Sequence, residues 1–338
     1  MSPHAMRVAG YAAAVLALAL FPLVGGKFGV DFVTKMMVFA IFALSLELLV
    51  GQVGLVCFGQ AAFFGIAGYA AVLLTPKAAA ASIWWLLPAA LGASGLFALF
   101  MGSLSIRTKG VYFIMVTLAF SQMAYYVAHD TPLGGGTDGI YLDFTPVVAI
   151  AGVALIDLAK PRPFYYFVLA MLIAVFVFLA IVLRSRFGRA LSGIRVNEQR
   201  MRAAGFSTYP YKLAAFVLSG LVAGLAGFLF AVKDGFVNPE LMGWNVSGTV
   251  LMMIILGGIG QLHGAVIGAF AFSLLEEFFK LDSVFGDFSK HWHLGVGIVI
   301  IACVAAMPRG LVGGRLRRVT AAKTEGTEDT EDTEEGHE

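Results

Sequence analysis

Long apolar segments recur along almost the whole of this 338-residue chain. Each is close to the length of about 20 residues that a helix needs to cross a bilayer, and each is continuously rich in Leu, Ala, Phe and Val. A transmembrane β-barrel would instead alternate apolar and polar residues over strands of about ten residues. The pattern predicts an all-α, polytopic integral membrane helix bundle. The segments are residues 8–25, 31–50, 83–105, 110–128, 163–183, 211–232 and 291–307.

Two further apolar regions, residues 53–75 and 247–280, are interrupted by glycines. A break in a helix at membrane depth is tolerated only where protein buries it or where it lines a cavity. Together with the uninterrupted segments, these regions predict about 8–10 spans, some of them broken or re-entrant. Composition agrees, because the chain is 59% hydrophobic and only 13% charged. Few soluble domains could bury so much apolar surface.

Basic residues predict the orientation of the bundle. Residues 184–205, RSRFGRALSGIRVNEQRMRAAG, hold six arginines, and Lys and Arg in short loops favour the cytoplasm. Loop 184–210 is therefore expected in the cytoplasm, with both termini on the same side. Arg107 and Lys109 also lie on the cytoplasmic side if region 53–75 crosses the membrane and region 247–280 forms a hairpin or re-entrant pair. The outer face then receives residues 129–162, 233–246 and 280–290.

The C-terminus differs from the rest of the chain. Eight of the 21 acidic residues lie between Glu325 and Glu338, and this tail has almost no apolar side chains to bury. We expect a transmembrane domain at residues 1–318 and a disordered acidic tail at residues 319–338.

The arginine-rich loop also carries the signals of a short helix. Asn197 is a favoured N-cap, Glu198 follows at the positive end of the helix, and Gly205 is a natural left-handed stop. A helix of about two turns is unstable alone, so it must pack against something. The alternative is a simple positive-inside anchor, which explains the arginines but not the order of cap, acid and glycine.

Residues 188–227 resemble the cytoplasmic coupling loop and following helix of permeases from branched-chain amino acid ABC importers, specifically the LivM-type half of the permease pair. Further segments agree in order, from about residue 30 to residue 314. They are LELLVGQVGLVCFGQAAFFGIAGYAAVLL at 46–74, GVYFIMVTLAF at 110–120, GGGTDGI at 134–140, GGIGQLHGAVIGA at 257–269 and PRGLVGG at 308–314.

The resemblance implies that the loop docks on an ATP-hydrolysing subunit through a Glu-Ala-Ala type motif that ends in glycine. Glu198 takes the place of the acid and Gly205 that of the glycine. Arg200 and Met201 stand where the family has its alanine pair, so this chain departs from the pattern there. The residues that lead into the motif are Gly188, Arg189, Ile194 and Arg195.

Several kinds of site have no signature in the sequence. There is no GxxxxGK[ST] phosphate loop, so ATP hydrolysis is expected on separate subunits. No spacing indicates a catalytic centre, a metal site, a cofactor or nucleic-acid binding. Cys57 and Cys303 both lie in apolar runs, where packing is their expected role.

Polar residues within the apolar segments are candidates for a translocation path, because such residues are costly in a membrane. The candidates are Glu47, Gln60, Thr117, Ser121 and Gln122. Close helix packing is the alternative for the glycine-rich segment around Gln60. A salt bridge or snorkelling to the membrane edge is the alternative for Glu47.

The resemblance implies one half of the pore of an importer in the bacterial inner membrane. Its expected partners are a second permease half of LivH type, two ATP-binding subunits, a periplasmic substrate-binding protein and membrane lipid. Branched-chain or related hydrophobic amino acids are the expected substrates. Related permeases for urea, amides or aromatic acids remain an alternative, as does an ion-coupled secondary transporter or channel that needs no ATPase.

Overall fold

The computed structural model describes residues 3–76, 82–142, 144–150, 153–158, 160–281, 291–307 and 310–313. Within these ranges, seven helices are long and apolar enough to cross a membrane. Three shorter apolar helical stretches are Ala12–Leu23, Gln60–Leu74 and Trp244–Gly257. The all-α, polytopic class is therefore confirmed. The acidic tail at 319–338 and most of the predicted outer segment 280–290 lie outside the described residues.

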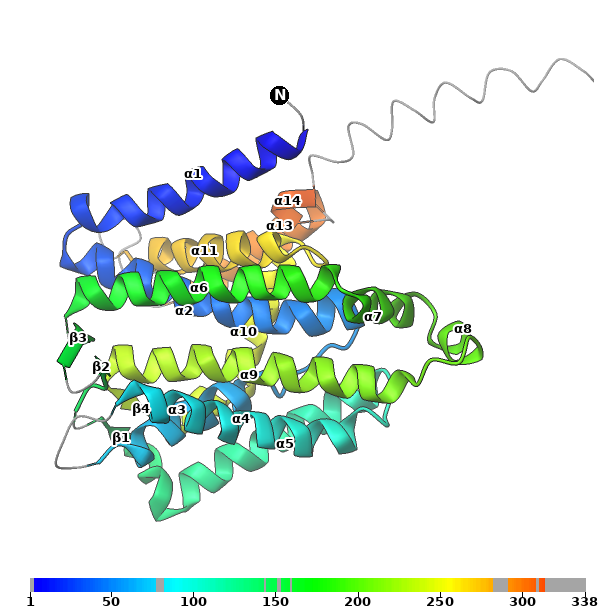
Figure 1. Cartoon of the computed structure of the whole chain (residues 1–338), viewed down its shortest axis with the longest axis horizontal. Helices are drawn as coiled ribbons and strands as arrows, with labels where there is room; N and C mark the ends of the chain where they lie inside the picture. Colours follow the sequence, from blue (N-terminus) through cyan, green and yellow to red (C-terminus); the bar gives the residue numbers. More distant parts are fainter. Residues whose placement is uncertain are drawn as a thin grey trace, which may run out of the picture.

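The bundle consists of long helices joined by short turns (Figure 1). The main helices are α1 (Pro3–Val24), α2 (Lys27–Glu47), α3 (Gln60–Leu74), α4 (Ile83–Ser105), α5 (Val111–Asp130), α6 (Pro161–Arg184), α9 (Thr208–Asp234), α10 (Trp244–Gly257), α11 (Leu262–Phe279) and α13 (Trp292–Ala306). The smaller helices are η1 (Leu48–Val53), η2 (Pro132–Gly134), η3 (Gly136–Asp138), α7 (Arg186–Val196), α8 (Glu198–Ala203), η4 (Pro239–Met242) and α14 (Gly310–Gly313).

Helix α2 lies at the centre of the bundle. Its residues from Met36 to Glu47 are buried except for Phe39, because α6, α9, α10 and α11 all pack around it. In Figure 1, α2, α6 and α9 run side by side along the length of the bundle. A helix that is apolar and buried on every side forms the core of a membrane protein.

Helix α9 packs closely on α3 and α4 through a glycine seam, which consists of Gly220, Gly224 and Gly227. A Cβ atom at Gly220 would lie 2.5 Å from Cβ of Ala98 on α4, and one at Gly227 would collide with the backbone of Phe64 on α3. Small residues allow helix backbones to approach in this way inside a membrane. The seam therefore holds α9 against two neighbouring helices.

Both glycine-rich regions contain a break in helical structure, the first at residues 54–59 and the second at residues 258–261. Helix α2 continues as the π-helix η1, then the chain leaves helical structure at Gly54 (φ 78°) and resumes it at Gln60. Between α10 and α11 the chain turns at Gly258 (φ 112°) and Gly260 (φ 98°). At about 1.5 Å per residue, α3 and α10 are each roughly 22 Å long, shorter than the hydrocarbon core. Helix α3 alone is thus too short to cross the hydrocarbon core, and region 247–280 forms a pair of helices.

Contacts between loops test which segments share an end of the bundle. The antiparallel pairing of β1 (Ile140–Tyr141) with β4 (Phe236–Val237) brings together two loops that the sequence assigned to one face. A second pair, β2 (Val147–Ile150) with β3 (Val153–Asp157), lies in the same region. At the opposite end, where α7 and α8 project (Figure 1), the hydroxyl of Tyr209 donates to the Ser103 carbonyl at 3.0 Å. The outer loops 129–162 and 233–246 therefore meet as the sequence predicted, whereas the positions of both termini and the side of the membrane on which each end lies stay predictions.

Candidate functional site

Loop 184–210 folds into two short helices, α7 and α8. Helix α7 begins after Ser185, whose hydroxyl accepts from the Gly188 N–H at 3.5 Å. Gly188 is buried, and a Cβ there would lie 2.5 Å from Cα of Leu183 at the end of α6. Leu191 and Ile194 are also buried, whereas Arg189 is exposed. Helix α7 is therefore amphipathic and lies with one face on the bundle.

Helix α8 has the cap and the stop that its sequence predicted. The side-chain oxygen of Asn197 accepts from the Arg200 N–H at 2.9 Å. At the other end Gly205 has a φ of 87°, and the Phe206 N–H donates to the Met201 carbonyl at 3.0 Å, as in a Schellman motif. A Cβ at Gly193 of α7 would lie 2.8 Å from the Met201 sulfur. Met201, which departs from the family pattern, thus packs α8 on α7.

Glu198 makes three contacts within the chain. Its carboxylate accepts from Lys212 at 2.5 Å, from Arg202 at 2.6 Å and from the Thr208 hydroxyl at 2.9 Å. Burial raises the pKa of Glu198, but the hydrogen bonds and the charge of Lys212, followed by Arg202, outweigh it and hold the pKa near 2. Glu198 is therefore ionised at neutral pH and fastens the start of α8 to the start of α9.

Glu47, at the end of α2, has no exposed surface. One of its carboxylate oxygens accepts from the Gly260 N–H at 2.6 Å, in the turn between α10 and α11. The guanidinium of Arg195, on α7, donates to the Gly51 carbonyl in η1. Glu47 and Arg195 thus each bond to the backbone near a break, although the sequence placed one in the path and the other in the loop.

Gln60 is fully buried at the start of α3. Its amide nitrogen donates to the hydroxyls of Ser45 and Ser219 at 2.8 Å each, and the Ser219 hydroxyl donates to the Ser45 carbonyl at 2.6 Å. These bonds join α3 to α2 and α9 across the bundle. Gln60 therefore serves helix packing in this conformation, which was the alternative to a path residue.

Thr117, Ser121 and Gln122 lie on α5 and differ in surroundings. The Thr117 hydroxyl accepts from the Phe58 N–H at 3.3 Å, within the non-helical residues that precede α3. The Ser121 hydroxyl donates to the Met242 carbonyl at 2.8 Å. Gln122 is partly exposed, and its side chain has no hydrogen bond with another described residue. Of the three, Gln122 alone is accessible to a molecule outside this chain.

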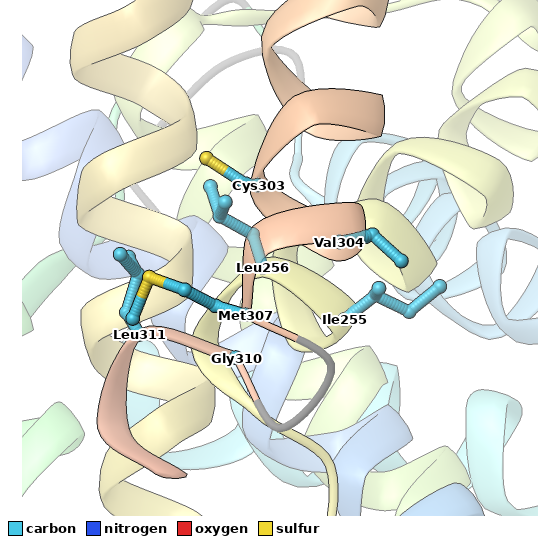
Figure 2. Close-up of a pocket in the computed structure, with 7 residues that line it drawn as sticks. All are labelled: Ile255, Leu256, Cys303, Val304, Met307, Gly310 and Leu311. Carbon is cyan, nitrogen blue, oxygen red and sulfur yellow. The ribbon is translucent and has the colours of Figure 1, made fainter. Parts of the chain in front are cut away.

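A cavity at the end of α10 is too small for a substrate. Its volume is about 10 Å³, which is roughly the space of one water molecule. Figure 2 shows the residues around it, which come from α10, α13, the turn after α13 and α14. They are Ile255, Leu256, Cys303, Val304, Met307, Gly310 and Leu311. Cys57 and Cys303 are free thiols in packed positions, as expected.

Residues 29–305 match the family described as the permease component of branched-chain amino acid transport systems. The chain belongs to this family. The match covers every span from α2 to α13, together with both breaks and the loop 184–210. The residues described above are therefore features of a transport permease in the membrane.

Curated relatives of the permease include the high-affinity branched-chain amino acid transport system permease protein LivM of Escherichia coli (strain K12). The two are 29% identical over 317 residues, which cover 88% of this chain and 73% of the relative. LivM of Salmonella typhimurium is 28% identical over the same shares. The autoinducer 2 import system permease protein LsrC of Klebsiella pneumoniae is 30% identical over 47% of this chain and 44% of its own. No solved structure matches the permease.

Sequence reasoning missed the partners of the buried polar residues. Ser45, Ser219 and Ser247 lie in mostly apolar segments, and the Ser247 hydroxyl accepts from the Ala61 N–H at 2.9 Å. A serine within a span is a signal for bonds between helices. Lys212, which pairs with Glu198, is a cation just inside α9 and gives a similar signal.

Proposed function

We propose that this permease forms one half of the pore of an ATP-driven importer for branched-chain or related hydrophobic amino acids. A second permease half of LivH type completes the pore, two ATP-binding subunits hydrolyse ATP, and a periplasmic binding protein delivers the substrate. The bundle spans the bacterial inner membrane with loop 184–210 and both termini in the cytoplasm. The observation that carries this proposal is the two-helix loop, which α7 anchors on the bundle while α8 extends away from it.

The exposure and the fixed geometry of α8 support docking on a protein partner. Helix α8 has no buried residue, and Gln199, Arg200 and Ala203 are exposed on it. An exposed helix of six residues is unstable without contacts, yet a cap, a left-handed stop and the bonds of Glu198 fix its position. A simple positive-inside anchor needs only the charges and none of this geometry.

The exposed face of α5 supports a second permease half. Met115, Gln122 and Tyr126 follow one another at intervals of seven and four residues, so they lie on one face of the helix. All three are at least partly exposed, and α5 is the least buried of the spanning helices. A Gln side chain without a partner is costly in lipid, whereas Met and Tyr are enriched at protein interfaces. This face therefore suits the companion half and the path between the halves.

The extent of similarity supports the substrate class. The relatives named for branched-chain amino acid transport match 88% of the chain, whereas the LsrC relative, named for autoinducer 2 import, matches 47%. Most buried hydroxyls of the described bundle already bond to backbone carbonyls or to a neighbouring side chain, so we expect the accessible lining of the half-pore to be mostly apolar. Such a lining fits aliphatic side chains better than urea or short amides.

Reconstitution tests the proposal. The permease, its companion half, the ATPase subunits and the binding protein are placed in liposomes, and entry of radiolabelled leucine is measured. We expect uptake that requires both ATP and the binding protein. Acetamide, urea and phenylalanine serve as competitors that identify the substrate class. Uptake that follows a sodium or proton gradient without ATP would support the ion-coupled alternative and refute the proposal.

A further inference from the structure

Two breaks in the spanning helices meet at one buried carboxylate. Glu47 accepts from the Gly260 N–H, and it also lies directly over Gly51, where a Cβ would be 2.6 Å from its carboxyl carbon. Its second oxygen has no hydrogen-bond partner among the described residues. A carboxylate enclosed in this way is costly unless a positive charge lies near it. A nearby cation, or a proton on the second oxygen, therefore stabilises Glu47 at this position.

Arg195 supplies that cation from the loop. Its guanidinium donates to the Gly51 carbonyl, and a Cβ at Gly54 would lie 3.3 Å from its Cγ. A Cβ at Gly260 would lie 3.9 Å from its Nη1. One side chain of α7 thus touches the first break directly and reaches the edge of the second. The rigid planar guanidinium can hold a fixed position at both.

One further contact joins the two breaks, and another joins the second break to α14. The Gln52 amide donates to the Gly260 carbonyl at 3.4 Å. From the C-terminal side, a Cβ at Gly310 of α14 would lie 2.8 Å from the carbonyl carbon of Gly257. The first break, the second break and α14 therefore form one packed junction.

The two breaks have the backbone features of hinges. Residues 54–59 belong to no helix, and Gly54, Gly258 and Gly260 all have positive φ angles. Hinges are a few residues at the ends of elements that absorb changes in φ and ψ. Elsewhere the helices are held by close packing, as along the glycine seam, and packed interfaces do not deform gradually.

We propose that Arg195 and Glu47 are positioning residues that transmit movement of loop 184–210 to both hinges. When the ATPase subunits move α7, Arg195 carries Gly51 with it, and Glu47 carries Gly260. The tilts of α3 and of the α10–α11 pair then change together. This inference rests on the proposed function, and it assigns the Arg195 guanidinium to the helix breaks, although the residue also has exposed surface on the loop.

The test uses the complete transporter in liposomes, with uptake and ATP hydrolysis measured in the same sample. Arg195→Ala and Glu47→Ala are expected to lower the substrate imported per ATP hydrolysed by about tenfold, a size typical of coupling between sites. The ATPase subunits should still co-purify with both variants. The double variant should be no worse than either single variant, because both act on one link. Arg186→Ala, which removes an exposed arginine from the same helix, is the matched control and should keep the wild-type ratio.

Conservative variants separate transmission from structural support. Arg195→Lys keeps the charge and one donor, so an intermediate ratio is expected. Glu47→Gln keeps an acceptor for the Gly260 N–H but loses the attraction to Arg195. If Glu47→Ala assembles poorly, the transport ratio of Glu47→Gln is measured instead. A wild-type ratio in Arg195→Ala overturns the inference, as does a fall in uptake that only follows loss of assembled complex. Failure of the proposed function has a different signature, because the wild-type transporter would then show no ATP-dependent uptake.

Discussion

Helices α7 and α8 are neighbours in one loop, yet they are built in opposite ways. Helix α7 is part of the bundle, since Gly188, Leu191 and Ile194 are buried and Arg195 reaches the helix breaks. Helix α8 has no buried residue, and hydrogen bonds at its start and a left-handed turn at its end hold it in place. Apolar packing fixes α7, whereas polar bonds and backbone conformation fix α8. The loop thus joins an inner helix that can transmit force to an outer helix that can dock.

The largest expected effect concerns packing on α7. Ile194 is 3% exposed and Val196, two residues later, is 81% exposed. Ile194→Ala should destabilise the protein by about 2–5 kcal/mol, because it leaves a cavity in the contact with the bundle. Val196→Ala removes a side chain that packs on little and should change stability by less than about 0.5 kcal/mol. Thermal unfolding in detergent measures both, and equal effects would show that α7 is not anchored.

A smaller and local effect is expected at Glu198. Glu198→Ala leaves Lys212, whose side chain is 11% exposed, without its partner. The cost is about 1–3 kcal/mol, because a largely buried charge loses its hydrogen bond. Hydrogen exchange should increase in α8 and at the start of α9, with α7 unchanged. Glu198→Ala combined with Lys212→Met should recover part of the loss, whereas no recovery would mean that the pair does not hold α8.

Substitutions at Gly205 test the contribution of backbone conformation alone to the stability of α8. Its φ is 87° and nothing lies within 4 Å of a Cβ built there, so a substitution meets strain but no collision. Gly205→Val should cost about 1–2 kcal/mol at the end of α8 and weaken binding of the ATPase subunits, with normal accumulation in the membrane. Gly205→Asn should be tolerated better, because Asn adopts this conformation more readily. Equal ATPase binding by the wild type and Gly205→Val would show that α8 is not part of the docking surface.

The smallest effect is a dependence on pH. The pKa of Glu198 is about 2, below its usual value of 4.5, so its bonds are fully present above about pH 4.5 and are lost as the pH falls toward 2. A spin label at Gln199 should gain mobility across this interval in the wild type. The same label in Glu198→Ala should show a mobility that does not vary with pH in that range. A transition near pH 6 would indicate that another group controls α8.

Much of the fold could be predicted because it depends on local signals. The apolar runs locate the spans within a few residues, and Asn197 and Gly205 define α8 through the conformations that these residues favour. The roles of Arg195, Glu47 and Gln60 could not be predicted, because each depends on contacts with residues more than 140 positions away or in another helix. The family resemblance assigned Arg195 to the loop, and a polar side chain in an apolar segment made Glu47 a candidate for the path, but only their positions in space place both at one junction.

The glycine seam on α9 also decides where an engineer could alter this permease. Gly220, Gly224 and Gly227 leave no room for larger side chains, so variation there would cost the fold before it changed selectivity. The exposed face of α5 has no such constraint, since Met115, Gln122 and Tyr126 meet few neighbours in the chain. A mutant library aimed at new substrates should therefore keep α9 constant and concentrate its diversity on α5.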